Sequence, residues 1–184
     1  MLFYNQITLT PEELKSRGIL DAPQALRNLD LIGSRLGTGA FSSLLPPLLA
    51  AVSRAGDPDM ALNNAERYFN ALVDVPPVLS LCRDRPEALL SLMTIFGGSR
   101  YLSTYLASLA DESLTLLADP AWLSRAAGKK LLSEQFALLM EAVQSERDLF
   151  RALRKFRRQQ MLRIGLRDLM GKADLQETVG ELSD

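Results

Sequence analysis

The stretch LRKFRRQQMLRIGLRDL, residues Leu153–Leu169, combines basic residues with apolar stripes at helical spacing and therefore predicts one long helix. From Arg147 to Arg167 there are eight Lys or Arg residues and a single acid, Asp148, whereas the rest of the chain carries 13 basic and 21 acidic residues. The net charge of −1 thus conceals a segment of about +7 within a body of about −8. Such asymmetry predicts a partner, a nucleotide or a neighbouring domain.

Composition favours helices outside this stretch as well. Apolar residues make up 47% of the 184 residues, enough for a buried core, and Leu is abundant among good helix formers. Helix-start signals recur, as in Thr10–Glu13, and no stretch alternates convincingly with period two. We predict an all-α, multi-helix orthogonal or bundle fold with no sheet, forming a single domain over residues 1–184. A long basic helix should cover 145–171, and 173–184 should begin another, cut-off helix.

Missing residue types exclude several chemistries. The chain has no histidine, so histidine acid/base catalysis and histidine metal sites are excluded within it. The one cysteine, Cys82, can form neither an internal disulfide nor a cysteine zinc site, and its apolar surroundings predict a small buried residue. We expect a reducing, cytoplasmic setting.

No signal peptide is visible, and the apolar run Leu44–Val52 is far shorter than the roughly 20 residues that span a bilayer, so we expect no membrane association.

Acidic residues gather where helices are expected to begin. Negative charge stabilises helix N-termini, so capping explains these residues without a metal. Gly97-Gly98 lacks the lysine and the preceding strand of a phosphate-binding loop. We therefore expect no catalytic residue, no cofactor site and no metal site in this chain. The acidic positions are Glu12, Glu13, Asp57, Asp59, Asp111, Glu112 and Asp119.

The apolar side of the long helix changes along its length. At 100° per residue, a first stripe over 149–156 lies almost opposite a second stripe over 162–169, and Arg163 and Arg167 fall near the face of the first. The first half should pack on the preceding helices. The second half is either covered within the same bundle or docks on a domain outside this chain; the ending inside an amphipathic pattern favours docking. The stripes are Leu149, Leu153 and Phe156, then Leu162, Leu166 and Leu169.

A resemblance to a known family adds to these patterns. The string FRRQQMLRIGLRDLMGKADLQETVGELSD, Phe156–Asp184, closely resembles the segment before the first catalytic domain of the bifunctional glutamine synthetase adenylyltransferase/adenylyl-removing enzymes. DPDMALNN, Asp57–Asn64, and FGGSRYLS, Phe96–Ser103, also resemble that family. The similarity runs from about Ala22 to the end of the chain.

The resemblance implies a parent enzyme with two nucleotidyltransferase domains. One would transfer AMP from ATP to a tyrosine of glutamine synthetase, and the other would remove it by phosphorolysis, both with divalent metal such as Mg²⁺. The family's metal-binding Asp motif follows shortly after the point where this chain ends, and Ser183-Asp184 is not that motif because no second Asp follows. The chain is therefore expected to be a helical segment, truncated before a nucleotidyltransferase domain, that is inactive alone. It resembles the N-terminal half, which the family associates with adenylyl removal.

We interpret the basic helix as a docking surface for the adjacent nucleotidyltransferase domain, because arginine binds carboxylates and phosphates well. Glutamine synthetase and the nitrogen-signalling PII protein would be partners through the parent. A solvated basic face is the plainer alternative. Another is a stand-alone helical module that binds nucleic acid, although the pI of about 5.6 argues against it. The candidate docking residues are Arg157, Arg158, Leu162, Arg163, Leu166, Arg167 and Leu169.

Overall fold

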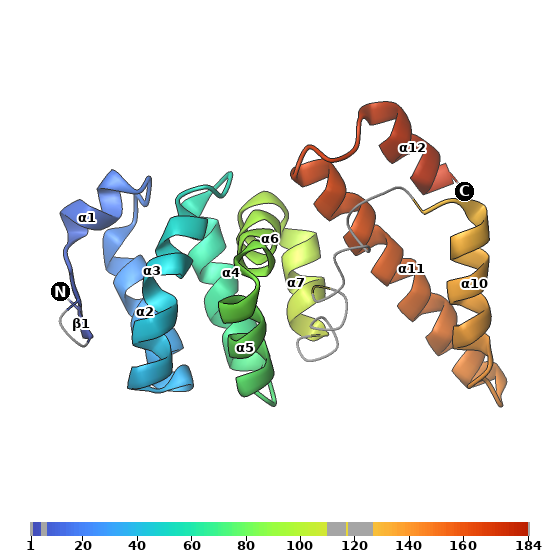
Figure 1. Ribbon diagram of the computed structural model, residues 1–184, viewed down its shortest axis with the longest axis horizontal. Helices are drawn as coiled ribbons and strands as arrows, with labels where there is room; N and C mark the ends of the chain where they lie inside the picture. The colour runs from blue at the N-terminus through green and yellow to red at the C-terminus, as the bar shows by residue number, and fades with distance from the viewer. Residues whose placement is uncertain (1, 5–6, 110–116, 118–126, 184) are drawn as a thin grey trace. The chain divides into compact units, whose positions relative to one another are not determined.

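The computed structural model describes residues 2–4, 7–109, 117 and 127–183 (Figure 1). These residues form ten helices and one short hairpin, which confirms the all-α class. Where the sequence predicts one domain, the chain divides into two compact units, Met1–Ala118 and Asp119–Asp184. We call them unit 1 and unit 2. The helices expected after Asp111 and Asp119 lie outside the described residues.

The hairpin at the N-terminus corrects the expectation that the chain has no sheet. Strand β1, Leu2–Tyr4, pairs antiparallel with β2, Ile7–Leu9, so that Leu2 lies opposite Leu9. Both strands are rich in aromatic or β-branched residues, and only two residues separate them, as is typical of a tight hairpin. Strands of three residues are too short to show the alternation by which longer strands are recognised in a sequence.

The helices of unit 1 begin at strong local signals. The Thr10 hydroxyl accepts a hydrogen bond from the backbone of Glu13, whose carboxylate accepts one from the backbone of Thr10, which confirms the expected capping box. Five of the helices have proline in their first turn, where its missing N–H costs nothing. The helices are α1 (Pro11–Ser16), α2 (Ala22–Leu36), α3 (Thr38–Val52), α4 (Pro58–Ala71), α5 (Pro76–Asp84), α6 (Pro86–Gly98) and α7 (Arg100–Ser108).

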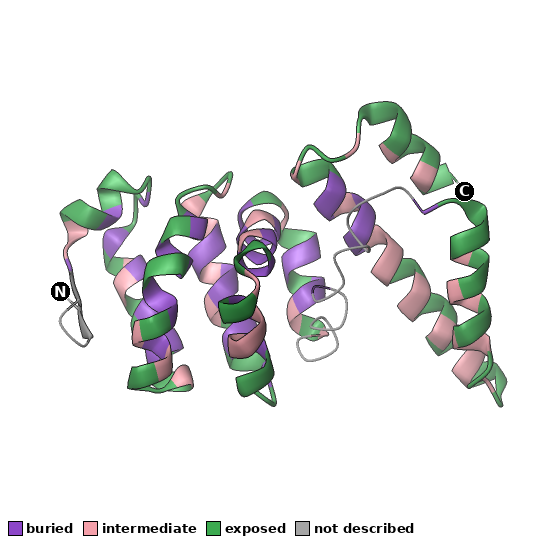
Figure 2. Ribbon diagram, viewed as in Figure 1, coloured by how far each residue is buried: buried purple, intermediate pink, exposed green. Residues whose placement is uncertain are grey.

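The core of unit 1 is built around α4 and α6. Helix α4 packs against α2, α6 and α7, and α6 also packs against α3 and α5. Buried residues accordingly line the inner faces of these helices (Figure 2). The ring of Tyr68 lies 5.7 Å from that of Phe69 and 5.5 Å from that of Phe96, and all three side chains are fully buried. Aromatic pairs at these separations add specific stabilisation to the burial of apolar area.

The two shorter stretches of family resemblance meet inside unit 1. A Cβ atom on Gly97 would lie 2.7 Å from the Cβ of Ala55 and 2.8 Å from the carbonyl oxygen of Asp57, so only glycine fits there. The buried Asn64 side chain donates a hydrogen bond of 2.9 Å to the carbonyl oxygen of Phe96. The end of α6 is thereby held tightly against the start of α4.

Unit 2 contains three described helices: α10 (Lys129–Met140), α11 (Glu146–Leu169) and α12 (Leu175–Ser183). Helix α11 is the long basic helix expected over 145–171, and Ser145 caps it by accepting a hydrogen bond from the backbone of Asp148. The following turn contains Gly171 at a φ of +63°, a left-handed conformation that favours glycine.

Candidate docking surface

The first stripe of α11 is only partly covered. Phe156 packs edge-on against Phe136 of α10 with ring centroids 5.4 Å apart, and Leu149 is half-buried. Leu153 remains exposed. The first half of α11 therefore packs on the preceding helix, as expected, but neither helix buries a continuous apolar face: α10 has no fully buried residue.

The second stripe is covered unevenly. Leu162 and Leu166 are fully buried, whereas Leu169 at the end of α11 is exposed. Ile164, on another side of the helix, is also buried. This part of α11 is therefore covered on more than one side by the chain itself.

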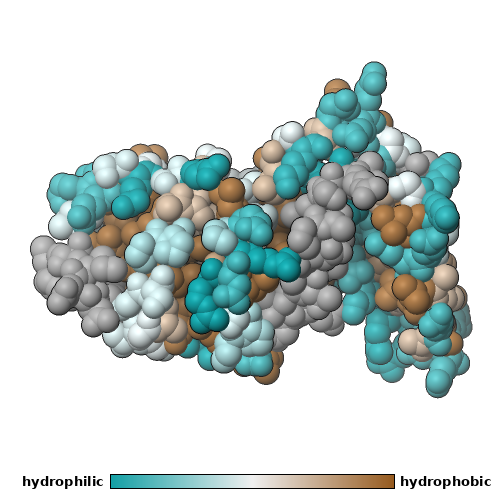
Figure 3. Space-filling view, in the orientation of Figure 1, coloured by the Kyte–Doolittle hydropathy of each residue, from teal (hydrophilic) through white to brown (hydrophobic). Residues whose placement is uncertain are grey.

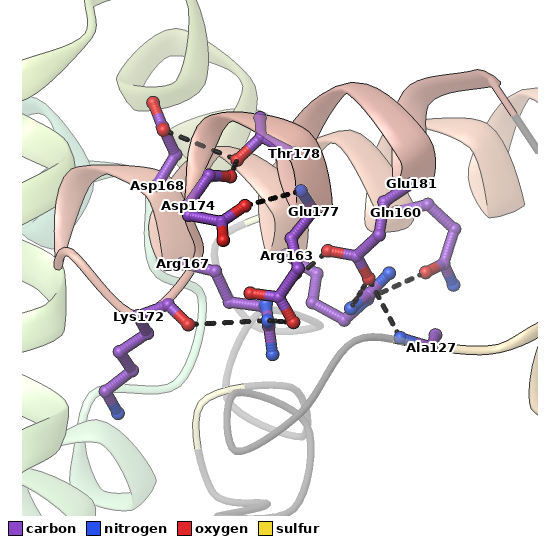
Figure 4. A network of polar contacts seen from close by, with 10 residues as sticks. All are labelled: Ala127, Gln160, Arg163, Arg167, Asp168, Lys172, Asp174, Glu177, Thr178 and Glu181. Carbon is purple, nitrogen blue, oxygen red and sulfur yellow. Dashed lines mark hydrogen bonds and ion pairs between the residues drawn. The ribbon is translucent and has the colours of Figure 1, made fainter.

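Two of the predicted docking arginines are also buried. Arg163 is 3% exposed and Arg167 is 1% exposed, and both face α12 (Figure 4). Arg163 Nη1 lies 2.6 Å from Glu181 Oε1, and Arg167 Nε lies 3.5 Å from Glu181 Oε2. Arg167 Nη2 also lies 3.5 Å from Glu177 Oε1. Among the described residues, the acidic groups that face these two arginines therefore belong to α12.

Hydrogen bonds extend this ion-pair network on both sides (Figure 4). Glu181 Oε1 accepts a hydrogen bond of 2.8 Å from the backbone of Ala127, and Gln160 Oε1 accepts one of 3.0 Å from Arg163 Nε. Gln160 in turn donates to Gln135 of α10 at 3.1 Å. One carboxylate in α12 thus connects the start of α10, the second half of α11 and α12 itself.

The buried charges of this network need partners, because a buried charge is stable only when it is paired and hydrogen-bonded. The side chain of Glu181 is 6% exposed and lies between two arginines, whereas that of Glu177 is 47% exposed. The Nη1 group of Arg167 has no hydrogen-bond partner among the described residues. Removing the Glu181 charge would therefore leave two buried guanidinium groups without enough negative charge beside them to offset the cost of their burial.

An open pocket of about 570 Å³ lies between the three helices of unit 2. Arg163 and Glu181 contribute to its polar wall, and Arg157 contributes an exposed cation. In Figure 3, apolar surface appears over α10 and α11 with hydrophilic surface around it. The apolar lining consists of Leu132, Phe136, Phe156, Met161, Ile164 and Leu182.

The remaining surface candidates are exposed. Arg157 and Arg158 are both exposed on α11. Helix α12 exposes a set of apolar side chains that share one side of the helix by their spacing, and we call this set the α12 face. It consists of Leu175, Val179 and Leu182, with Leu175 78% exposed.

Sequence reasoning missed the acidic half of the network. Glu177 and Glu181 are four residues apart, as are Arg163 and Arg167, so each pair lies along one side of its helix. If the turn at Gly171 folds the second helix back on the first, the two arginines and the two glutamates come to face each other. This spacing is the signal in the sequence that could have predicted the ion pairs.

Among the residues that the structure describes, no group of three His, Cys, Asp or Glu side chains is placed to hold a metal ion. Within the same residues, no helix is both long and apolar enough to cross a membrane.

Comparisons with known proteins give a consistent result. The sequence model described as glutamate-ammonia ligase adenylyltransferase matches residues 89–184. Relatives named bifunctional glutamine synthetase adenylyltransferase/adenylyl-removing enzyme include proteins of Corynebacterium glutamicum, 29% identical over 96% of this chain, and Mycobacterium leprae, 31% identical over 93%. The Streptomyces avermitilis relative is 30% identical over 92%. The chain spans only 17–18% of the length of these relatives. No solved structure matches it.

Proposed function

Because this chain belongs to the glutamate-ammonia ligase adenylyltransferase family, we propose that it is a helical, non-catalytic segment of an enzyme that adenylylates and deadenylylates glutamine synthetase. The family match over residues 89–184 and the relatives aligned to more than nine-tenths of the chain support this proposal. The parent would act in the cytoplasm. Its ATP, its Mg²⁺ and the carboxylates that bind them are assigned to the remainder of the longer protein. No step of the reaction is assigned to the residues described above, whose donor groups form no metal-binding set.

The role we propose for unit 2 is docking on the adjacent nucleotidyltransferase domain. One observation carries this proposal: a buried ion-pair network holds α12 in place, although the apolar side chains of the α12 face are exposed. A helix fixed in this way with its apolar side in water is typical of a surface that another protein part covers. The neighbouring domain is the favoured occupant because the relatives continue far beyond the length that this chain spans.

This proposal gives the predicted docking residues two different roles. Arg157 and Arg158 are exposed cations that can contact acidic groups of the neighbour directly. The buried residues act through α12, because they position the helix rather than touch the partner; they are Leu162, Arg163, Leu166 and Arg167. Glutamine synthetase and the PII protein would then meet the parent as a whole.

The test uses the full-length parent enzyme carrying Val179→Asp in the α12 face. We expect at least a tenfold faster proteolytic separation of this segment from the remainder and a lower rate of adenylyl transfer or removal, because a carboxylate would be buried at the interface. The matched control is Val73→Asp in unit 1, since Val73 is 86% exposed. Equal proteolysis and equal activity in the two variants would contradict docking through α12.

Nucleic-acid binding remains the second candidate, and the exposed cations of α11 favour it. Arg147, Arg154, Arg157 and Arg158 are all exposed on this helix. A basic helix of this kind would bind DNA with an affinity that falls steeply with salt concentration. A gel shift of labelled duplex DNA by this chain at 50 mM and 200 mM salt tests it, and no shift at either salt concentration would exclude this function.

A further inference from the structure

A second pocket, separate from the proposed docking surface, lies in unit 1 where the stretches 57–64 and 96–103 come together. It has a volume of about 660 Å³ and lies between the first turn of α2, the first half of α4 and the start of α7. Unlike the pocket of unit 2, its lining is mainly polar. The residues that matter for its chemistry are Asp57, Asp59, Asn63, Arg67, Arg100 and Thr104.

Two arginines reach this pocket from different helices. Arg67 lies on α4, and Arg100 is the first residue of α7. Among the described residues, neither guanidinium has a hydrogen-bond or ion-pair partner, although both line the same pocket. Asp57 and Asp59 line the same pocket, but among the described residues neither forms an ion pair with these two guanidinium groups. An anion that binds both arginines would therefore supply a direct counter-charge that the pocket's own carboxylates do not give.

The carboxylates of the pocket accept hydrogen bonds from backbone N–H groups instead. Asp59 accepts a hydrogen bond of 2.9 Å on each of its two oxygens, from the backbone N–H groups of Leu20 and Asp21. Asp57 Oδ1 accepts one of 2.9 Å from the backbone of Met60, as the N-cap of α4. These carboxylates therefore stabilise helix starts and do not form salt bridges with the two arginines.

Neutral donors complete the site. Asn63 Oδ1 accepts a hydrogen bond of 2.7 Å from Asn28, which itself accepts one of 2.8 Å from Gln24. This chain of amides fixes the orientation of Asn63 and leaves its Nδ2 group without a hydrogen-bond acceptor among the described residues. The Thr104 hydroxyl, on α7, adds another possible donor at the pocket wall.

We propose that this pocket binds a small oxyanion, a carboxylate or phosphate group, through the guanidinium groups of Arg67 and Arg100. Arginine can donate two parallel hydrogen bonds to either oxyanion, which makes it better suited to this task than lysine. Asn63 and Thr104 would donate to the remaining oxygens. The site lies wholly within unit 1, so a test of anion binding there is independent of the proposal that the α12 face is a docking surface.

The test is a nuclear magnetic resonance titration of the ¹⁵N-labelled chain with sodium phosphate and, separately, with sodium acetate, at constant ionic strength. We expect saturable amide shifts at the starts of α4 and α7 with a dissociation constant in the millimolar range. Saturation by phosphate alone would assign the site to phosphoryl groups, and saturation by acetate would assign it to carboxylates. No saturable shift with either anion would overturn the proposal.

Variants separate specific binding from general attraction to a charged protein. The double variant R67Q/R100Q should weaken binding at least tenfold, whereas R17Q/R54Q, which removes two exposed arginines outside the pocket, should leave it unchanged. Thermal melts confirm that each variant folds. Arg100→Lys keeps the positive charge but removes the planar guanidinium group that donates two parallel hydrogen bonds, so it should weaken anion binding several-fold. This single variant still tests the proposal if the double variant does not fold. Wild-type affinity in Arg100→Lys and R67Q/R100Q would also overturn the proposal.

Discussion

Glu181 Oε1 lies 2.6 Å from Arg163 Nη1, and both side chains are almost completely buried. The pair joins α12 to the second half of α11 across the turn at Gly171, and Arg167 adds a second contact to the same carboxylate. Breaking one side of a buried pair is costly because the other charge stays buried. The position of α12, and with it the exposure of the α12 face, therefore depends strongly on a single carboxylate.

Replacing this carboxylate should destabilise unit 2. We expect Glu181→Gln to lower the free energy of unfolding by about 3–5 kcal/mol, because two buried arginines lose their main counter-ion. Hydrogen exchange at the amides of α12, together with urea unfolding, measures the loss. Glu177→Gln is the matched control and should cost below about 1 kcal/mol, since the Glu177 side chain is 47% exposed. Equal losses in the two variants would contradict the central role of Glu181.

A methyl group on Gly97 should disrupt the contact between α6 and the start of α4. The added Cβ would lie 2.7 Å from the Cβ of Ala55, so Gly97→Ala should destabilise the protein by about 1–3 kcal/mol. Gly39→Ala is the control, because no atom lies within 4 Å of its added Cβ and alanine favours helix. Thermal unfolding followed by circular dichroism should show a lower Tm for the first variant only. An unchanged Tm in Gly97→Ala would mean that the backbone relaxes without cost.

Removal of the Asp59 carboxylate should loosen the start of α2. Asp59→Ala leaves the backbone N–H groups of Leu20 and Asp21 without their acceptor, and we expect a loss of about 1–3 kcal/mol. Asp84→Ala serves as control, because the Asp84 carboxylate is 62% exposed and pairs with the neighbouring Arg83 at the surface. Urea unfolding of unit 1 distinguishes them. A loss in Asp59→Ala no larger than in Asp84→Ala would show that water replaces the carboxylate adequately.

The Cys82 thiol should be unreactive in the folded protein. Burial raises its pKa from 9.0 to about 12, so the nucleophilic thiolate is nearly absent at neutral pH. We expect its reaction with a disulfide reagent at pH 8 to be at least a hundredfold slower in the native state than in guanidinium. Comparable rates in the two states would contradict burial of the thiol.

The same shift predicts how stability depends on pH. The unfolded chain releases the thiol proton near pH 9.0, before the folded chain does near pH 12, so the unfolded state binds fewer protons between these values. The contribution of Cys82 is therefore fully present below about pH 9 and is lost as the pH rises towards 12. Urea unfolding should show a steeper decline above pH 9 for the natural chain than for Cys82→Ala. Parallel pH profiles would rule out this contribution.

Much of the local structure could be predicted because its causes lie within a few residues. The capping box at Thr10, the prolines in first turns and the cap at Ser145 each act over one helical turn, and the structure confirms the helices that they begin. The hairpin of β1 and β2 was missed because three-residue strands carry too little pattern. For the docking candidates, the sequence identified Arg163 and Arg167 as unusual positions but did not identify what faces them.

The sequence by itself determined the all-α class, the long basic helix and the family, because helical spacing, caps and motif strings are all read along one chain. Only the tertiary structure decided which side chains meet: Arg163 with Glu181 across the turn at Gly171, and Arg67 with Arg100 at one polar pocket. Helix formation depends on neighbours three or four residues apart, whereas these encounters depend on how whole helices pack. That packing is a sum of many weak contacts between helices, so the spacing of charged residues along the chain is compatible with these encounters but does not fix them.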